Sequence, residues 1–188
     1  LPKNETEGAR YYQLAADQGL SIALNALGTC YLFGVGLPKY EEVGVSYFRK
    51  AIEKGSIVGE INLACCYGNG TGIEVNEKEA VRLFRKPAEL GYANVQHYLG
   101  LYYLEGKGVV QNDQKALKHL LSAAAQGYID SILLLGYMHE VGKGVEMNMN
   151  TALKYYQRGV ALGIEYAVQA VERVVDRADE PTASIAQD

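Results

Sequence analysis

The sequence predicts an all-α protein, a right-handed α/α superhelical solenoid of antiparallel helix pairs with a 36-residue period. A single Gly, a Gly-x-Gly pair and a Leu each recur at that interval without insertion or deletion. The recurring positions are Gly19, Gly55, Gly91, Gly127 and Gly163; Gly34, Gly70, Gly106 and Gly142, each two residues before another Gly; and Leu27, Leu63, Leu99 and Leu135. Such a period indicates one supersecondary unit stacked on itself, and repeat proteins of this kind usually act through a surface.

The third copy of the unit shows most clearly why each period holds two helices. Apolar residues fall at helical spacing over 93–104, which predicts the first helix of the unit. Gly106 and Gly108 end this helix, because Gly readily adopts the left-handed conformation that a helix C-terminus needs. Asn112 is an N-cap candidate for a second helix over about 113–126, which the next recurring Gly closes.

The same reasoning along the chain predicts a single solenoid over residues 1–178. It begins with an unpaired second helix and ends with an unpaired first helix, whose charged end is expected to face solvent. The expected segments are 5–19 for the half unit, 20–55, 56–91, 92–127 and 128–163 for the full units, 164–177 for the capping helix and 179–188 for a disordered tail. Pro87 falls inside a second helix, where it removes one backbone hydrogen bond and predicts either a tolerated kink or an early helix end.

Two further recurring positions predict the core. The second helices carry a large apolar residue at the same place in every copy, and the residue after each recurring Leu is small. The large residues are Tyr12, Phe48, Phe84, Leu120 and Tyr156, and the small ones are Gly28, Ala64, Gly100 and Gly136. A Gly inside a helix costs up to about 1 kcal/mol, so a close approach of neighbouring helices is the expected compensation.

Charge and composition argue against several classes of function. The chain has 188 residues and a formal net charge of −4, which gives no basic surface for nucleic acid or anionic membrane. No apolar run approaches the roughly 20 residues that a membrane-spanning helix needs. Because the chain starts at Leu1 and not at Met, we expect a fragment or a processed chain, and the lack of a signal peptide says little about its compartment.

The three Cys residues predict free thiols. Cys30 and Cys66 occupy the same place in successive copies, and equivalent points on packed helices lie about 10 Å apart. A disulfide cannot close beyond a Cα separation of about 7 Å. Free thiols favour a reducing compartment, whereas the two Asn-x-Thr glycosylation triplets at Asn4 and Asn69 point the other way, so the localisation stays open.

The complete unit resembles the Sel-1-like repeat family, relatives of the tetratricopeptide repeat. The matching residues in the third copy are Leu99-Gly100, Tyr103, Gly106-Lys107-Gly108-Val109, Asp113, Lys115-Ala116 and Ala123-Ala124 with Gly127. The likeness covers roughly residues 5–175 and depends on four copies in phase. Departures from the pattern are Ala64, Pro87, His139, Met149 and Gly159. The resemblance implies antiparallel helix pairs and a role as a protein-binding adaptor.

The sequence shows no constellation of catalytic residues, metal ligands or cofactor-binding residues. His97, His119 and His139 occupy different places in the unit, so stacking does not bring them together. Glu105 and His139 could approach each other across copies, but two groups do not make a metal site. His139 stands where other copies have a core Tyr and is expected to pack there. The Gly-x-Gly pairs follow helices, not strands, so they are turns and not phosphate loops.

Residues of the first helices that point away from their neighbours form the candidate binding surface. A helical projection places these residues on the side that is concave in related solenoids. The expected partner-binding residues are Asn25, Thr29, Asn62, Asn94, His97, Tyr98, Leu101, Leu134, Tyr137 and Arg173. Amides can pair with a peptide backbone while aromatic rings bury area. The alternative is that the apolar members of the set fill a tightly curved interior.

The sequence therefore predicts a non-enzymatic scaffold or adaptor that binds a protein or peptide on its concave surface, with no nucleic-acid binding and no membrane insertion. Two alternatives stay open. The surface or the end helix could bind a second copy of the chain. A weak hydrolase, as suggested for cysteine-rich members of the family, would need His97, Glu105 and His139 to cluster. Those members carry paired Cys in each repeat, which this chain lacks.

Overall fold

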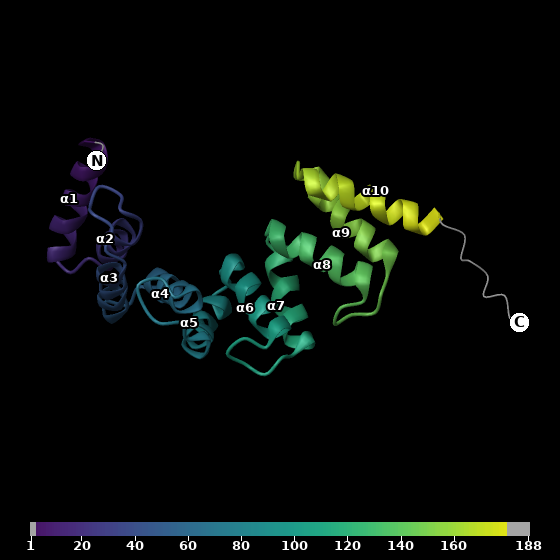
Figure 1. Cartoon of the computed structure of the whole chain (residues 1–188), viewed down its shortest axis with the longest axis horizontal. Coiled ribbons are helices and arrows are strands. Elements are labelled where there is room, and N and C mark those ends of the chain that lie inside the picture. The colour runs from purple at the N-terminus through teal and green to yellow at the C-terminus, as the bar shows by residue number, and fades with distance from the viewer. Residues whose placement is uncertain (1–2, 180–188) are drawn as a thin grey trace, which may run out of the picture.

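The computed structural model describes residues 3–179, which form ten α-helices and no strand. The helices are α1 (Lys3–Asp17), α2 (Ser21–Phe33), α3 (Glu41–Glu53), α4 (Ile57–Asn69), α5 (Glu77–Glu89), α6 (Ala93–Glu105), α7 (Asp113–Ala125), α8 (Ile129–Val141), α9 (Met149–Ala161) and α10 (Glu165–Asp179). They follow one another along an arc whose two ends, α1 and α10, curve to the same side (Figure 1). The predicted all-α solenoid is confirmed.

Each helix packs mainly on its neighbours in sequence. The pairs α2–α3, α4–α5, α6–α7 and α8–α9 form four full units, and the second helix of one unit packs on the first helix of the next. Helix α1 packs on α2 and α10 packs on α9, so an unpaired helix flanks the four pairs at each end. Because α10 runs to Asp179, that residue belongs to the helix and not to the predicted tail, and residues 180–188 lie outside the described residues.

Gly and Asn residues position the loop between the two helices of a unit. Gly106 ends α6 with a φ of 69°, and Gly108 has a φ of 64°. A Cβ at Gly108 would also collide with the backbone carbonyl of Glu77 in the preceding unit. The next helix then starts at a capping Asn: Asn112 accepts a hydrogen bond of 2.9 Å from the backbone N–H of Lys115. The turn thus fixes both the end of one helix and the start of the next.

The predicted core position on the second helices is buried in four copies out of five. Phe48, Phe84, Leu120 and Tyr156 are at most 2% exposed, but Tyr12 is 44% exposed, so its prediction as a core residue is wrong. The first helix that precedes each buried residue explains the difference. A Cβ added at Gly28 of α2 would lie 2.5 Å from the Phe48 ring, which shows how closely that helix covers the ring. No described helix precedes α1, so Tyr12 lacks this cover.

Helix α5 continues through Pro87 to Glu89, so of the two alternatives that the sequence left open, an early helix end is excluded. Pro87 lies in the last turn and is fully buried. Its carbonyl oxygen accepts a hydrogen bond of 3.2 Å from the N–H of Tyr92, as the Ala51 carbonyl does from Ser56 one copy earlier. Pro87 has no N–H to donate to the Leu83 carbonyl, so α5 lacks that one bond. The bonds that close the helix, from Gly91 to Ala88 and from Tyr92 to Pro87, are the same as one copy earlier, so the loss stays confined to a single bond in the last turn.

Candidate interaction surface

The exposed residues of the first helices differ in chemistry from those of the second helices. We define the first-helix surface as the exposed residues of α2, α4, α6 and α8: Ile22, Phe33, Val58, Asn69, Asn94, Tyr98, Glu105, Asp130, Tyr137 and Val141. Only Glu105 and Asp130 among these ten carry a charge. The second-helix surface, the exposed residues of α3, α5, α7 and α9, carries a charge at thirteen of its twenty-one positions. The two surfaces therefore offer a partner different chemistry.

The residues predicted to bind a partner differ in how much of each is accessible. Asn94, Tyr98 and Tyr137 are exposed, and His97 is buried. The others are half-buried: Asn25, Thr29, Asn62, Leu101, Leu134 and Arg173. Some of the polar groups already have partners within the chain. The Asn62 side-chain amide donates to the Asn25 side-chain oxygen over 2.9 Å, and the Thr29 hydroxyl donates to the Asn25 carbonyl over 3.1 Å.

His97 differs from the surface position that the helical projection gave it. Its ring is only 7% exposed, and its Nδ1 lies 2.9 Å from the Ser131 hydroxyl on α8. Burial lowers the pKa of the His97 imidazole below its usual value, so the ring is neutral at pH 7. A Ser–His pair can serve as nucleophile and base. Ser131 is 0% exposed, however, so a substrate cannot reach it, and the pair instead links α6 to α8.

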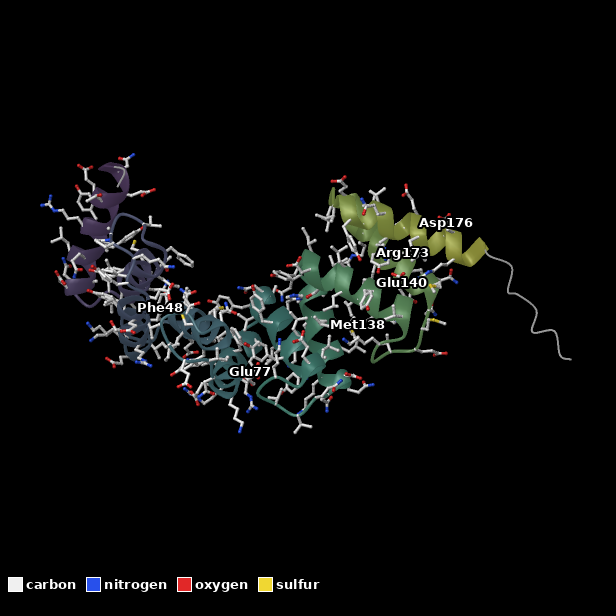
Figure 2. All side chains as sticks on the ribbon, in the orientation of Figure 1. Phe48, Glu77, Met138, Glu140, Arg173 and Asp176 are labelled. Atoms are coloured by element: carbon white, nitrogen blue, oxygen red, sulfur yellow. The ribbon has the colours of Figure 1, made fainter. Side chains whose placement is uncertain are left out.

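Arg173 is held by an ion pair that the sequence pattern did not predict. The Glu140 carboxylate on α8 accepts hydrogen bonds of 2.8 Å from both Nε and Nη2 of Arg173 on α10. It also accepts 3.0 Å from Arg177 Nη1 and 2.7 Å from the Tyr156 hydroxyl on α9. Figure 2 shows Glu140 and Arg173 facing each other between α8 and α10. Arg173 and Arg177 therefore attach the last helix to the solenoid, whereas the sequence had placed them on a solvent-facing end.

Glu140 occupies a core position of the repeat. Leu32 and Leu104 stand at the same place in earlier copies and are buried, and Glu140 is itself only 3% exposed. The hydrogen bonds from Arg173, with a further one from Tyr156, hold the pKa of the Glu140 carboxyl below its usual value. The Glu in an otherwise apolar series was the sequence signal for this contact, since a buried carboxylate needs cationic partners.

A small pocket opens between α2 and α4 beside Asn62. It has a volume of about 290 Å³, and none of its lining residues carries a charge. Leu32, Phe33 and Phe48 line its apolar side, while Asn62 and Asn69 contribute amides. Two of its lining residues, Thr29 and Asn62, are in the set predicted from the sequence, but the residues of α3 and of the adjoining turn that complete the pocket are not.

The three residues named for a hydrolase are each held by a different neighbour. His97 contacts Ser131, Glu105 pairs with the Lys107 ammonium, and His139 has its Nδ1 3.4 Å from the Glu146 carbonyl oxygen. No hydrogen bond or ion pair joins any two of the three within residues 3–179. Over the same residues, no group of three or more His, Cys, Asp or Glu side chains could hold a metal ion, and no helix is long and apolar enough to span a membrane. The three thiols are free, and burial raises the pKa of Cys66 to about 11.

Helix pairs at a constant period, joined by Gly-capped turns, define this chain as an α-solenoid repeat protein. It belongs to the Sel1 repeat family. The family model for the Sel1 repeat matches residues 1–20, 21–56, 57–92, 93–128 and 129–164. The resemblance found in the sequence is thereby confirmed, and α10, which begins at Glu165, lies wholly beyond the last matched repeat. None of the curated proteins compared with the chain matches it.

Three examples illustrate the solved structures that are similar to the chain. One is a protective antigen present in uropathogenic Escherichia coli strains, displaying an SLR fold, with a TM-score of 0.86 at 32% identity; the match covers 92% of this chain and 37% of that one. A Sel1 repeat protein from Oxalobacter formigenes has a TM-score of 0.84 at 30% identity, covering 94% and 70%. Cysteine rich protein B of Helicobacter pylori has a TM-score of 0.53 at 29% identity, covering 70% and 94%. The chain thus spans little more than a third of the first of these proteins.

Proposed function

We propose that this chain is a non-enzymatic scaffold that binds a partner protein or peptide on its first-helix surface. The observation that carries the proposal is the difference in charge between the two surfaces. Eight of the ten exposed residues on α2, α4, α6 and α8 are apolar, aromatic or amide side chains. Protein interfaces are depleted of charge at their centre and enriched in aromatic residues, so the first-helix surface has the composition of an interface.

Within the sequence-predicted set, Asn94, Tyr98 and Tyr137 are the residues we expect to contact the partner most directly. They are exposed, and Tyr98 and Tyr137 each combine an apolar ring with a polar hydroxyl. Asn25, Thr29, Asn62, Leu101 and Leu134 would contribute only part of their surface. We leave His97 and Arg173 out of the contact set, because their polar atoms already bind Ser131 and Glu140.

Binding rather than catalysis is also the better explanation of the polar residues. The Ser131 hydroxyl beside His97 is buried, and Glu105 and His139 have separate partners. Membership of the Sel1 repeat family also supports an adaptor role, because members of this family commonly serve as protein-interaction scaffolds.

Self-association is a second candidate function, and α1 favours it. Tyr11, Tyr12 and Leu14 of this helix are all exposed, so α1 presents apolar area that no described residue covers. Repeat units stack through apolar helix surfaces, so a second copy could cover this helix. Light scattering over a range of concentrations tests it: a mass that doubles with concentration would support self-association, and a constant monomer mass would rule it out.

Paired double variants test the proposed surface. Val58→Lys with Tyr137→Lys adds two charges to the first-helix surface, and Leu121→Lys with Val160→Lys adds two to the second-helix surface. The four side chains are similarly exposed, between 39% and 45%, so both variants should fold. Affinity capture from an extract of the cells that make the protein, followed by mass spectrometry, should recover a partner with the wild type and the second variant but not with the first. Equal capture by both variants would place the binding surface elsewhere.

A further inference from the structure

The pocket between α2 and α4 has the properties of a binding site for one uncharged side chain. Its volume of about 290 Å³ lies at the lower end of the range for small-molecule sites, which leaves room for a side chain rather than for a cofactor. Phe33, which is exposed, forms its rim and Phe48 lies at its floor. A charged group entering it would lose water without meeting a counter-charge, so the pocket disfavours Asp, Glu, Lys and Arg side chains.

The next unit of the solenoid shows what fills the same place there. Phe84 stands 36 residues after Phe48, and two Tyr rings pack on it. The Tyr98 ring is stacked at 6.0 Å between ring centroids, and the Tyr102 ring meets Phe84 edge-on at 5.9 Å. The positions of these two Tyr residues are taken in the earlier unit by Asn62 and Cys66, which are much smaller.

The smaller residues explain why Phe48 borders an open pocket, whereas two Tyr rings cover the equivalent Phe84 one unit later. No aromatic ring within residues 3–179 packs on Phe48, and the pocket lies where the Tyr98 ring would reach if Asn62 were a Tyr. Tyr102 lies against Gly68, and the earlier unit has Leu32 at that position, so the ring that has no substitute beside Phe48 is that of Tyr98. The lining also carries polar groups, among them the amides of Asn62 and Asn69. One Asn62 N–H already binds Asn25, and the other amide groups can donate or accept hydrogen bonds with the backbone beside such a side chain.

We propose that this pocket takes a single aromatic side chain, Phe or Tyr, from the partner peptide, in the place that Tyr98 occupies one unit later. The proposal rests on the proposed function, because it names the part of the partner that the first-helix surface recognises. Aromatic pairs contribute beyond the area they bury, so a flat ring should bind better here than a saturated ring of the same size.

The test uses p-cresol, the side chain of Tyr as a free molecule, and records amide chemical shifts of the full chain by NMR. We expect saturable shifts at Thr29, Phe33 and Asn69, with a dissociation constant in the millimolar range. The saturated analogue 4-methylcyclohexanol should bind about two- to tenfold more weakly. Equal or tighter binding of the saturated ring, or shifts that do not saturate and spread over the whole surface, would overturn the assignment.

The variant Asn62→Tyr copies the next unit and should fill the pocket from within. It should weaken p-cresol binding at least tenfold, whereas Gln114→Tyr, which adds a Tyr to an exposed position on α7, should leave binding unchanged. Undiminished binding to Asn62→Tyr would contradict the proposal, and circular dichroism checks that both variants fold.

The outcomes also separate this proposal from the one on which it rests. If p-cresol does not bind but Val58→Lys with Tyr137→Lys abolishes partner capture, the pocket assignment fails and the first-helix surface stands. If p-cresol binds as expected and partner capture is unaffected by those two changes, the pocket stands as an aromatic site and the proposed function fails.

Discussion

The attachment of α10 to the solenoid should depend on the buried carboxylate of Glu140. The substitution Glu140→Gln keeps the size of the side chain but removes its charge and one of its two acceptor oxygens. The carboxylate accepts four hydrogen bonds, three of them from the guanidinium groups of Arg173 and Arg177. In the variant an amide NH₂ group would face those guanidinium donors, so at least two of the bonds are lost.

The expected loss in the free energy of unfolding is about 2–3 kcal/mol. Hydrogen bonds to charged groups contribute about 1.5–3 kcal/mol each, and breaking a fully buried ion pair costs about 3–5 kcal/mol. The expected loss is smaller than the cost of breaking a fully buried ion pair. The side chains of Arg173 and Arg177 are 37% and 50% exposed, and they regain water when the carboxylate is gone. For a chain of this length the change in Tm is about 4–12 °C.

Urea unfolding followed by circular dichroism measures the total loss, and hydrogen exchange shows where it falls. Because repeat units contact only their neighbours, α10 amides should lose protection before those of α4–α7. The control is Glu172→Gln, which changes an exposed carboxylate on α10. Its unfolding free energy should stay within about 0.5 kcal/mol of the wild type. A Glu140→Gln variant as stable as this control would refute the reasoning.

The contribution of Glu140 should also disappear at low pH. Hydrogen bonds from Arg173 hold the pKa of the Glu140 carboxyl below its unfolded value of about 4.3. The stabilisation is therefore complete above that unfolded pKa and is lost as the pH falls through the lower folded pKa. The difference in unfolding free energy between wild type and Glu140→Gln should be constant from pH 7 to about pH 5 and shrink below about pH 4. A difference that persists undiminished to pH 2 would contradict the assignment.

Other changes test the packing, the thiols and the helix caps. A Cβ at Gly100 would lie 2.8 Å from Leu120 Cγ, so Gly100→Ala should lower the unfolding free energy by about 1–3 kcal/mol in urea titrations. The control is Gly8→Ala, which should be neutral or slightly stabilising because no atom lies within 4 Å of the added Cβ. With its pKa raised to about 11, the Cys66 thiol should react with iodoacetamide at pH 8 far more slowly in the native chain than in urea, as mass spectrometry would show; equal rates would contradict its burial. Asn112→Ala should cost about 0.5–2 kcal/mol by the same urea assay, and no loss would mean that its cap bond contributes nothing.

The repeat made most of the fold predictable, because each local signal recurred in phase. Gly106 and Asn112 mark a helix end and a helix start by their backbone preferences alone, and the structure has both. The error at Tyr12 fell where the context is not repeated: the residue keeps the period, but no described helix precedes α1 to cover it. At Pro87 the sequence left a kink and an early helix end open, and the helix continues because Pro87 lies in its last turn.

The surface was harder to predict than the fold. A helical projection gives the direction of each side chain, but it does not show which side chains of neighbouring helices that side chain will contact. The projection therefore placed His97 on the surface, although Ser131 of α8 packs against its ring. The pocket beside Asn62 and the buried Glu140 both arise at positions whose residues differ from their equivalents in other copies. Comparing residue size and charge between copies, position by position, would have indicated both of them.

The most direct test of the binding account is a hydrogen-exchange footprint of the captured partner on the solenoid. The measurement compares amide exchange in the free chain and in the complex, helix by helix. A partner held on the first-helix surface should slow exchange in α2, α4, α6 and α8 and leave α3, α5, α7 and α9 as they are in the free chain. Protection confined to the second helices, or to α1 alone, would contradict the account.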